Sequence, residues 1–221
     1  TSIPSVAIEM QSLFSGQAIA VIHARLTTSP MVHKTIMTQG VGESSLMEII
    51  SDWEQHLRAS GLKLAYLPSV GSVRLRVSGT GTDQAALQRQ VDEEVKKVLP
   101  LIDEYAYGFD DERLEVVVGR LLKANAMHLA TAESCTGGLI GKMVTDAPGA
   151  SAYYLGGVVA YANEVKTAQL DVPAEMLAAQ GAVSPDVAEA MARGCRPRFA
   201  SDWALSVTGI AGPGGGTPDK P

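Results

Sequence analysis

The chain has little of what marks several broad classes of protein. Its 221 residues include two cysteines, Cys135 and Cys195, and four scattered histidines, a supply that indicates neither a disulfide framework nor a zinc site. No apolar run approaches the roughly twenty residues that cross a bilayer, and the N-terminus lacks the basic and then apolar segments of a signal peptide. We therefore expect a protein of the reducing cytoplasm, without a metal.

The chain also has only a small excess of negative charge. The formal net charge is −6, and 46% of the residues are hydrophobic, enough for the core of one or two domains. A modest acidic excess argues against a general nucleic-acid-binding protein. The glycines follow neither the GxxxxGK[ST] phosphate loop nor the GxGxxG dinucleotide pattern, which disfavours a kinase or a dehydrogenase.

What the sequence does contain is a pair of runs in which small hydroxyl residues accompany glycines. TAESCTGG occupies 131–138 and TGIAGPGGG occupies 208–216, after the short apolar stretches 128–131 and 203–207. Such stretches are typical of buried strands, and in an open α/β sheet ligands bind beyond the carboxyl ends of the strands. The runs predict a binding site there, although the glycines could instead serve only close helix packing or a loose loop.

A third cluster lies between these runs. DAPGAS ends at Ser151 and GGVVAYANEVK ends at Lys166, so the two residues flank one expected strand. A serine hydroxyl needs a base to become a nucleophile, and a lysine with a lowered pKa can supply one. Ser151 and Lys166 are thus a candidate dyad; the alternative is a turn-capping serine and a solvated lysine.

Taken in order, the segments TAESCTGG, PGAS, GGVVAYANEVK, GAVS at 181–184 and TGIAGPGGGTPDKP resemble the C-terminal domain of the CinA family. The resemblance implies a nicotinamide-nucleotide amidase, which hydrolyses nicotinamide mononucleotide to nicotinic acid mononucleotide and ammonia in pyridine nucleotide recycling. It implies no cofactor for this step and a homodimer. It also assigns the nucleophile to Ser151 and the base to Lys166.

Other residues of these segments are expected to bind substrate. Hydroxyl or N–H donors near Ser134, Thr136 or Thr208 could hold the oxyanion, the glycine turns could bind the phosphate, and Tyr161 could contact the ring or ribose. Cys135 is interpreted as a packing residue. The predicted substrate-binding set is Ser134, Thr136, Gly137, Tyr161, Asn163, Thr208, Gly209, Ala211 and Gly212.

The predicted fold is α/β: a three-layer sheet-and-helix amidase domain over 108–221, preceded by a smaller α+β domain over 32–107. In the latter we expect a helix over 43–60, strands over 62–67 and 73–78 and a long helix over 83–103. GVGESSL and KLAYLPSVGSVRLRVSG resemble the KH-like linking domain of CinA proteins. Its turn has no GxxG loop, so RNA binding is not supported, and Lys63, Arg74 and Arg76 are interpreted as a solvated sheet face.

Both ends of the chain resemble parts of a longer protein. Residues 1–31 resemble the tail of the family's molybdopterin-binding-like domain, with Ser5 and Ala7 departing from a PGVPxEM motif, and no pyrophosphatase activity is expected from this remnant. The resemblance implies a further strand and a phosphate-binding arginine beyond Pro221. The alternative function is a nucleotide-binding or competence-related and DNA-damage-related regulatory protein without catalysis.

Overall fold

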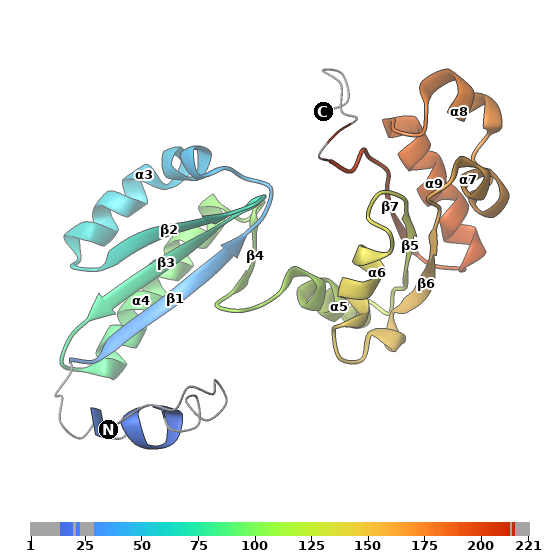
Figure 1. Ribbon diagram of the computed structural model, residues 1–221. Coiled ribbons are helices and arrows are strands. Elements are labelled where there is room, and N and C mark those ends of the chain that lie inside the picture. Colours follow the sequence, from blue (N-terminus) through green and yellow to red (C-terminus); the bar gives the residue numbers. More distant parts are fainter. Residues whose placement is uncertain (1–13, 20, 23–28, 213, 215–221) are drawn as a thin grey trace. The chain divides into compact units, whose positions relative to one another are not determined.

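The computed structural model describes residues 14–19, 21–22, 29–212 and 214. The chain divides into two compact units, Thr1–Asp110 and Asp111–Pro221, each built around its own sheet (Figure 1). The motif predicted at 4–10 lies outside the described residues, as do most positions after Gly212. A short helical segment, η1 (Phe14–Ala18), precedes the first sheet.

The first unit is a four-stranded antiparallel sheet with two helices. Its strands stand in the order β2-β3-β1-β4. The elements in chain order are β1 (Met31–Thr38), α3 (Glu43–Ala59), β2 (Lys63–Ser69), β3 (Ser72–Thr80), α4 (Gln84–Val98), η2 (Leu99–Leu101) and β4 (Ala106–Phe109). Asp83 begins α4, where its side chain accepts a hydrogen bond from the Ala86 N–H, as an N-cap residue does.

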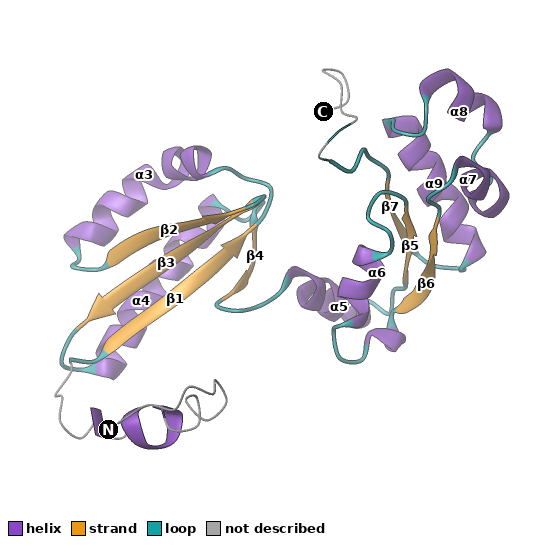
Figure 2. Cartoon of the chain, viewed as in Figure 1, coloured by secondary structure: helices purple, strands orange, loops and turns teal. Residues whose placement is uncertain are grey.

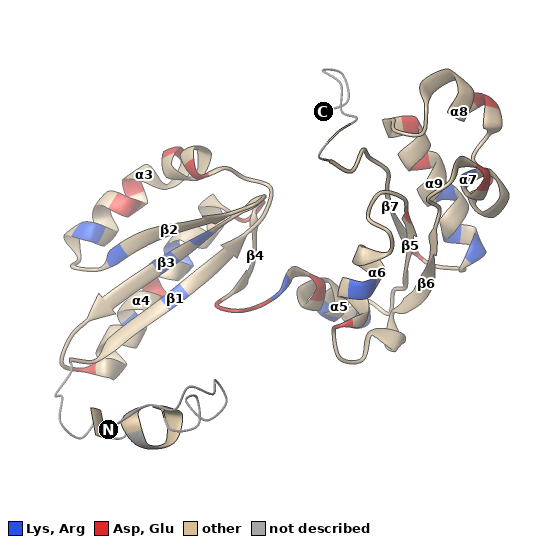
Figure 3. Ribbon diagram, in the orientation of Figure 1, with Lys and Arg blue, Asp and Glu red and all other residues tan. Residues whose placement is uncertain are grey.

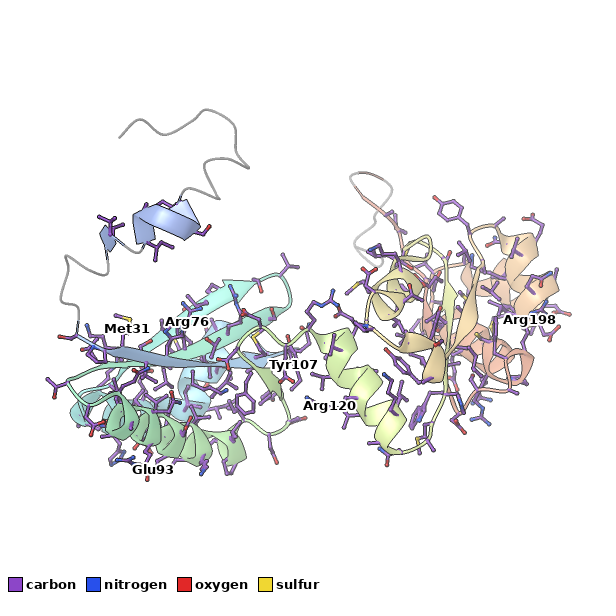
Figure 4. All side chains as sticks on the ribbon, turned by 90° about the horizontal axis from the view of Figure 1, so that it is seen from below. Met31, Arg76, Glu93, Tyr107, Arg120 and Arg198 are labelled. Carbon is purple, nitrogen blue, oxygen red and sulfur yellow. The ribbon has the colours of Figure 1, made fainter. Side chains whose placement is uncertain are left out.

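Alternation along β3 determines which face of this sheet is buried. Val73, Leu75 and Val77 are buried with side chains of α3 and α4 in one core, whereas Arg74 and Arg76 are half-buried on the opposite face. Figure 3 shows lysines and arginines on the strands and many of the acidic residues on the helices, and in Figure 4 Arg76 and Glu93 lie on opposite sides of the sheet. These arginines lie on the face opposite the core, but they are not fully solvated, and the Arg76 side chain donates to the Thr35 hydroxyl at 3.2 Å.

The sequence analysis omitted two strands of this sheet. β1 precedes the first expected helix, and β4 occupies a segment interpreted as a break between domains. β1 is the strand that β3 and β4 both pair with, so it holds the sheet together. Its burial pattern departs from strict alternation because Thr35 and Ile36 are both buried, which weakens the period-two signal on which strand prediction rests.

The second unit is a parallel sheet with helices on both faces, as predicted (Figure 2). The strand order is β6-β5-β7, so β5 is central. The elements are α5 (Leu114–Ala124), β5 (Leu129–Glu133), α6 (Leu139–Thr145), η3 (Ala150–Ala152), β6 (Tyr154–Val159), α7 (Asn163–Leu170), α8 (Ala174–Gln180), α9 (Pro185–Arg198) and β7 (Trp203–Val207).

Two apolar clusters cover the two faces of this sheet. Ala130 and Ala132 of β5 pack with side chains of α7 and α9 on one face, while Leu129 packs with Val144 of α6 and with Tyr153 on the other. The small alanines let helices approach the central strand closely. Among the described residues, no helix is long and apolar enough to cross a membrane.

Gly194 sets the approach of α9 to α7. A Cβ added at this glycine would lie 1.8 Å from the carbonyl oxygen of Leu170, the last residue of α7. The end of a flexible side chain can move away from such a contact, but the backbone cannot. Only glycine therefore permits this packing. The close approach matters for the site because α7 carries Lys166.

We expect Gly194→Ala to lower the free energy of unfolding by about 1–3 kcal/mol, since overpacking forces backbone shifts. Urea denaturation followed by circular dichroism measures the change. Gly81→Ala is the control, because a Cβ there meets nothing within 4 Å. Equal stability of the Gly194→Ala and wild-type chains would contradict this account of the helix contact.

Candidate active site

The carboxyl ends of three parallel strands place the two predicted runs side by side. Ser134 follows β5, and its N–H donates to the carbonyl of Val207, the last residue of β7, at 2.9 Å. On the other side, the Ala160 N–H donates to the Glu133 carbonyl at 2.7 Å. Both runs therefore begin where the sequence analysis expected, beyond the carboxyl ends of neighbouring strands.

Lys166 projects from α7 into this edge of the sheet and is only 1% exposed. Its ammonium group donates to the Ser134 Oγ at 3.0 Å, to the Ala160 carbonyl at 2.8 Å and to the Tyr161 carbonyl at 3.1 Å. None of the described carboxylates forms an ion pair with it. The acceptors are neutral groups, which is an unusual setting for a buried lysine.

Burial lowers the pKa of Lys166 from its ordinary value of 10.5, because removal from water disfavours the charged amine. The electrostatic influence of Cys135 and Glu164 opposes this effect but does not reverse it. A neutral amine would keep two N–H groups for the two carbonyls and would turn its lone pair to the third partner, Ser134. The arrangement can thus remove a proton from the Ser134 hydroxyl.

The predicted pairing of Ser151 with Lys166 within one chain is wrong. Ser151 lies in η3, before the amino end of β6, and is exposed, whereas Lys166 lies beyond the carboxyl end. β6 is six residues long, so the two side chains stand on the order of 15–20 Å apart at about 3.3 Å per residue. β6 ends at Val159, and Asn163 and Lys166 lie in α7, so the strand between Ser151 and Lys166 separates them instead of bringing them to one edge.

Glu133 fixes the turn that follows β5. It is 1% exposed, and its carboxylate accepts hydrogen bonds from the Thr136 hydroxyl at 2.7 Å and from the backbone N–H groups of Ile140 at 2.9 Å and Gly141 at 2.7 Å. Although burial acts to raise its pKa, these donors hold the pKa of the carboxyl below its ordinary value. Glu133 is therefore an ionised cap on the start of α6.

Two hydroxyls predicted to face substrate are engaged inside the protein. Thr136 donates to Glu133, and the Thr208 hydroxyl donates to the Ala182 carbonyl at 2.7 Å. The second bond ties the turn after β7 to the GAVS segment, whose Ser184 begins α9 by accepting from the Val187 N–H at 3.2 Å. Both threonines act as structural links between neighbouring segments.

The other predicted binding residues surround this edge. Gly137 lies in the turn after β5 with φ 61°, where glycine is favoured, and a Cβ at Gly209 would lie 3.0 Å from the Cys135 sulfur. Tyr161 is 72% exposed, and its side chain is open to a ligand. Asn163, Ala211 and Gly212 are exposed.

The sequence analysis did not recognise that Ser134 is the partner of Lys166. A signal was available: Ser134 directly follows a buried apolar strand, the position from which a side chain reaches the carboxyl edge. No sequence pattern predicts the two carbonyl acceptors, at Ala160 and Tyr161, because every residue has a main-chain carbonyl. Within the described residues, no cluster of three or more histidine, cysteine, aspartate or glutamate side chains could hold a metal ion.

The second unit is a parallel α/β unit in which a buried lysine contacts a serine beyond the central strand, an arrangement suited to nucleophilic catalysis. Comparison with known proteins defines its family. Residues 111–221 match the CinA C-terminal domain, and residues 33–108 match the damage-inducible protein CinA KH domain. The chain belongs to the CinA family.

Curated relatives support this assignment over the whole chain. A CinA-like protein of Cytophaga hutchinsonii is 47% identical over 220 residues, which are 100% of this chain and 52% of the relative. A putative competence-damage inducible protein of Halothermothrix orenii is 41% identical over 220 residues, again 100% of this chain and 52% of the relative. The chain thus spans about half the length of the curated relatives it matches.

Solved structures include a competence/damage inducible protein CihA from Agrobacterium tumefaciens. It is 41% identical, covers 48% of this chain and 67% of its own, and superposes with a TM-score of 0.46. A CinA superfamily protein from Escherichia coli is 34% identical over 49% of this chain and 63% of its own, with a TM-score of 0.47.

We expect Lys166 to titrate below 10.5, the ordinary value for lysine. Nuclear magnetic resonance of ¹³Cε-labelled lysine, assigned with Lys166→Met, measures this pKa directly. A Lys166 signal that titrates at or above 10.5 would contradict the desolvated setting.

Proposed function

We propose that this chain carries the catalytic site of a nicotinamide-nucleotide amidase, with Ser134 as nucleophile and Lys166 as base. The observation that supports this most directly is the 3.0 Å contact between the Lys166 amine and the Ser134 hydroxyl, made by a lysine whose burial lowers its pKa. Family membership and the sequence resemblance supply the substrate: nicotinamide mononucleotide, cleaved to nicotinic acid mononucleotide and ammonia.

The reaction follows from the placement of the two groups. Neutral Lys166 accepts the Ser134 proton while Oγ bonds to the carboxamide carbon, and the C=O electron pair moves to the carbonyl oxygen. Collapse of this intermediate breaks the C–N bond, and the proton held by Lys166 passes to the departing nitrogen as ammonia. Water then adds to the ester on Ser134, with Lys166 again as base, and releases the nicotinic acid product. These steps use protein side chains and water, so we propose that they need no cofactor.

The rest of the nucleotide has a suitable surface beside the dyad. The turns at Gly137 and Gly209 stand on neighbouring strands, and backbone N–H groups in such turns are suited to phosphate oxygens. Tyr161 presents an exposed ring directly after β6, where a nicotinamide or ribose could pack against it. We place the substrate along this edge, in a cytoplasmic enzyme of pyridine nucleotide recycling.

Replacing Ser134 or Lys166 should abolish ammonia release from nicotinamide mononucleotide, because the nucleophile and its base act as one unit. We expect Ser134→Ala and Lys166→Met each to lose at least about 10³-fold in kcat. Ser151→Ala is the matched control and should retain activity. Ammonia is measured by a coupled assay, in this chain and in the natural full-length protein.

The same variants separate the competing interpretations. Loss of activity in Ser151→Ala with retention in Ser134→Ala would transfer the nucleophile to Ser151. Nucleotide binding by wild type and by Ser134→Ala, with no ammonia release from either, would instead support the nucleotide-binding or regulatory function that the relatives' competence-damage names suggest.

We further propose that the second unit forms a homodimer through the free edge of β6. Four large apolar side chains are exposed there and on the adjoining helix: Leu139 and Met143 of α6 and Leu155 and Val159 of β6. The start of α6 lies beside the end of β6, since a Cβ added at Gly138 would lie 3.3 Å from a methyl group of Val159. Exposed apolar patches of this kind mark interaction surfaces.

Analytical ultracentrifugation should show a dimer that Val159→Glu converts to a monomer, because a carboxylate would be buried without a partner in the interface. Leu121→Glu is the control. Leu121 lies on α5, and its side chain is 56% exposed, close to the 51% of Val159, so this change should leave the dimer intact. A wild-type monomer at micromolar concentration would refute this interface.

A further inference from the structure

The turn after β5 has a hydrogen-bond pattern that leaves two main-chain N–H groups without an acceptor among the described residues. The Gly137 N–H donates to the Ser134 carbonyl at 3.0 Å, which closes a β-turn over residues 134–137. The N–H groups of Ile140 and Gly141 donate to Glu133. The N–H groups of Cys135 and Thr136, at the two central positions of the turn, have no acceptor among the described residues.

The hydroxyls near Ser134 are, in contrast, already committed. Thr136 donates its hydroxyl to Glu133, and Thr208 donates its hydroxyl to Ala182. Neither proton is available to a substrate oxygen unless an internal bond breaks. With these two hydroxyls engaged, the main-chain N–H groups of the turn that follows Ser134 are the donors next to it in the chain.

We propose that the N–H groups of Cys135 and Thr136 form the oxyanion hole of this site and that Glu133 is the positioning residue that holds them. The inference rests on the proposed amidase function and names the groups that stabilise its intermediate. An N–H of the residue directly after a nucleophilic serine is placed by chain connectivity close to the carbon under attack, and a second N–H from the next residue adds a convergent donor.

Glu133 can hold the turn because it spans it. Its carboxylate binds the Thr136 side chain within the turn and two N–H groups at the start of α6, after the turn. Its own main chain is fixed in β5, where it pairs with Val159 and Val207. The side chain thus ties the turn to the most constrained strand of the sheet, and the lowered pKa of its carboxyl keeps it charged at neutral pH.

The chemistry assigns a separate task to each group. As Ser134 Oγ bonds to the carboxamide carbon, the π-electron pair moves to oxygen and creates a negative charge that the two N–H groups bind. Lys166 holds the serine proton and does not contact this oxygen. Because hydrogen bonds to the oxyanion are stronger than those to the neutral carbonyl, loss of the hole lowers kcat more than it raises KM.

An aldehyde analogue of the substrate, nicotinaldehyde mononucleotide, tests the two donors directly. Ser134 can add to its carbonyl carbon to form a hemiacetal with no leaving group. In ¹⁵N-labelled protein, we expect the amide protons of Cys135 and Thr136 to move downfield when the adduct forms. The amide of Gly81, which donates to the Pro30 carbonyl in the first unit, is the internal reference, and Ser134→Ala should form no adduct.

This experiment distinguishes failure of the oxyanion hole from failure of the proposed amidase function. Formation of the adduct without movement of the Cys135 and Thr136 signals would overturn the oxyanion hole while supporting the nucleophile. Absence of any adduct with wild type would overturn the amidase assignment and the oxyanion hole with it.

Kinetics of matched variants test the role of Glu133. We expect Glu133→Gln to lower kcat about 10- to 100-fold, the range for partial loss of an oxyanion donor set, with KM and the acidic limb of the pH profile unchanged. Thr136→Val should lower kcat and Thr136→Ser should restore it, because serine keeps the donor to Glu133. A Glu133→Gln/Thr136→Val double variant should lose no more than the larger single loss.

A purely structural role would give a different result. Glu133→Gln would then lower stability in urea and leave kcat of the folded fraction unchanged, and that outcome would overturn the positioning role. Should Glu133→Gln fail to fold, the Thr136 pair and the wild-type amide shifts still decide the proposal.

Discussion

The buried contact between Lys166 and Ser134 is the constraint on which the second unit depends. A lysine that is 1% exposed and has only neutral acceptors is costly unless those acceptors are well placed. The parallel sheet meets this need because the segments after β5 and β6 leave the same edge. Gly194 then lets α9 press on the end of α7, which keeps the helix that carries the amine in place.

Opposite charges lie on the two sides of Ser134 without neutralising each other. Glu133 precedes it in the strand and is saturated by donors of the turn and of α6. Lys166 reaches it from α7 and is surrounded by carbonyl oxygens. Burial lowers the pKa of Lys166, while the Glu133 carboxylate is occupied by its own donors. Glu133 can therefore hold the turn in place while Lys166 accepts and returns the proton.

Much of the architecture could be predicted from the sequence. Short apolar runs ending in glycine and hydroxyl residues indicated parallel strands with a site at their carboxyl ends, and Trp203–Val207 is a strand with the expected bounds. β1 was missed because adjacent buried residues break its alternation. β6 ends at Val159 and Lys166 lies in α7 beyond its carboxyl end, so Ser151, before the amino end of β6, lies at the opposite end of the sheet.

The sequence by itself determined the family, the fold class and the residue types of the site. Periodicity, glycine positions and ordered motifs are local features, which can be recognised from residues that are near one another in the chain. Only the tertiary structure decided which serine meets Lys166, since Ser134 and Ser151 have the same chemistry and differ in which end of a strand they occupy. It also decided that the hydroxyls of Thr136 and Thr208 are engaged. Such choices depend on contacts between distant segments, which exist only once the sheet has formed.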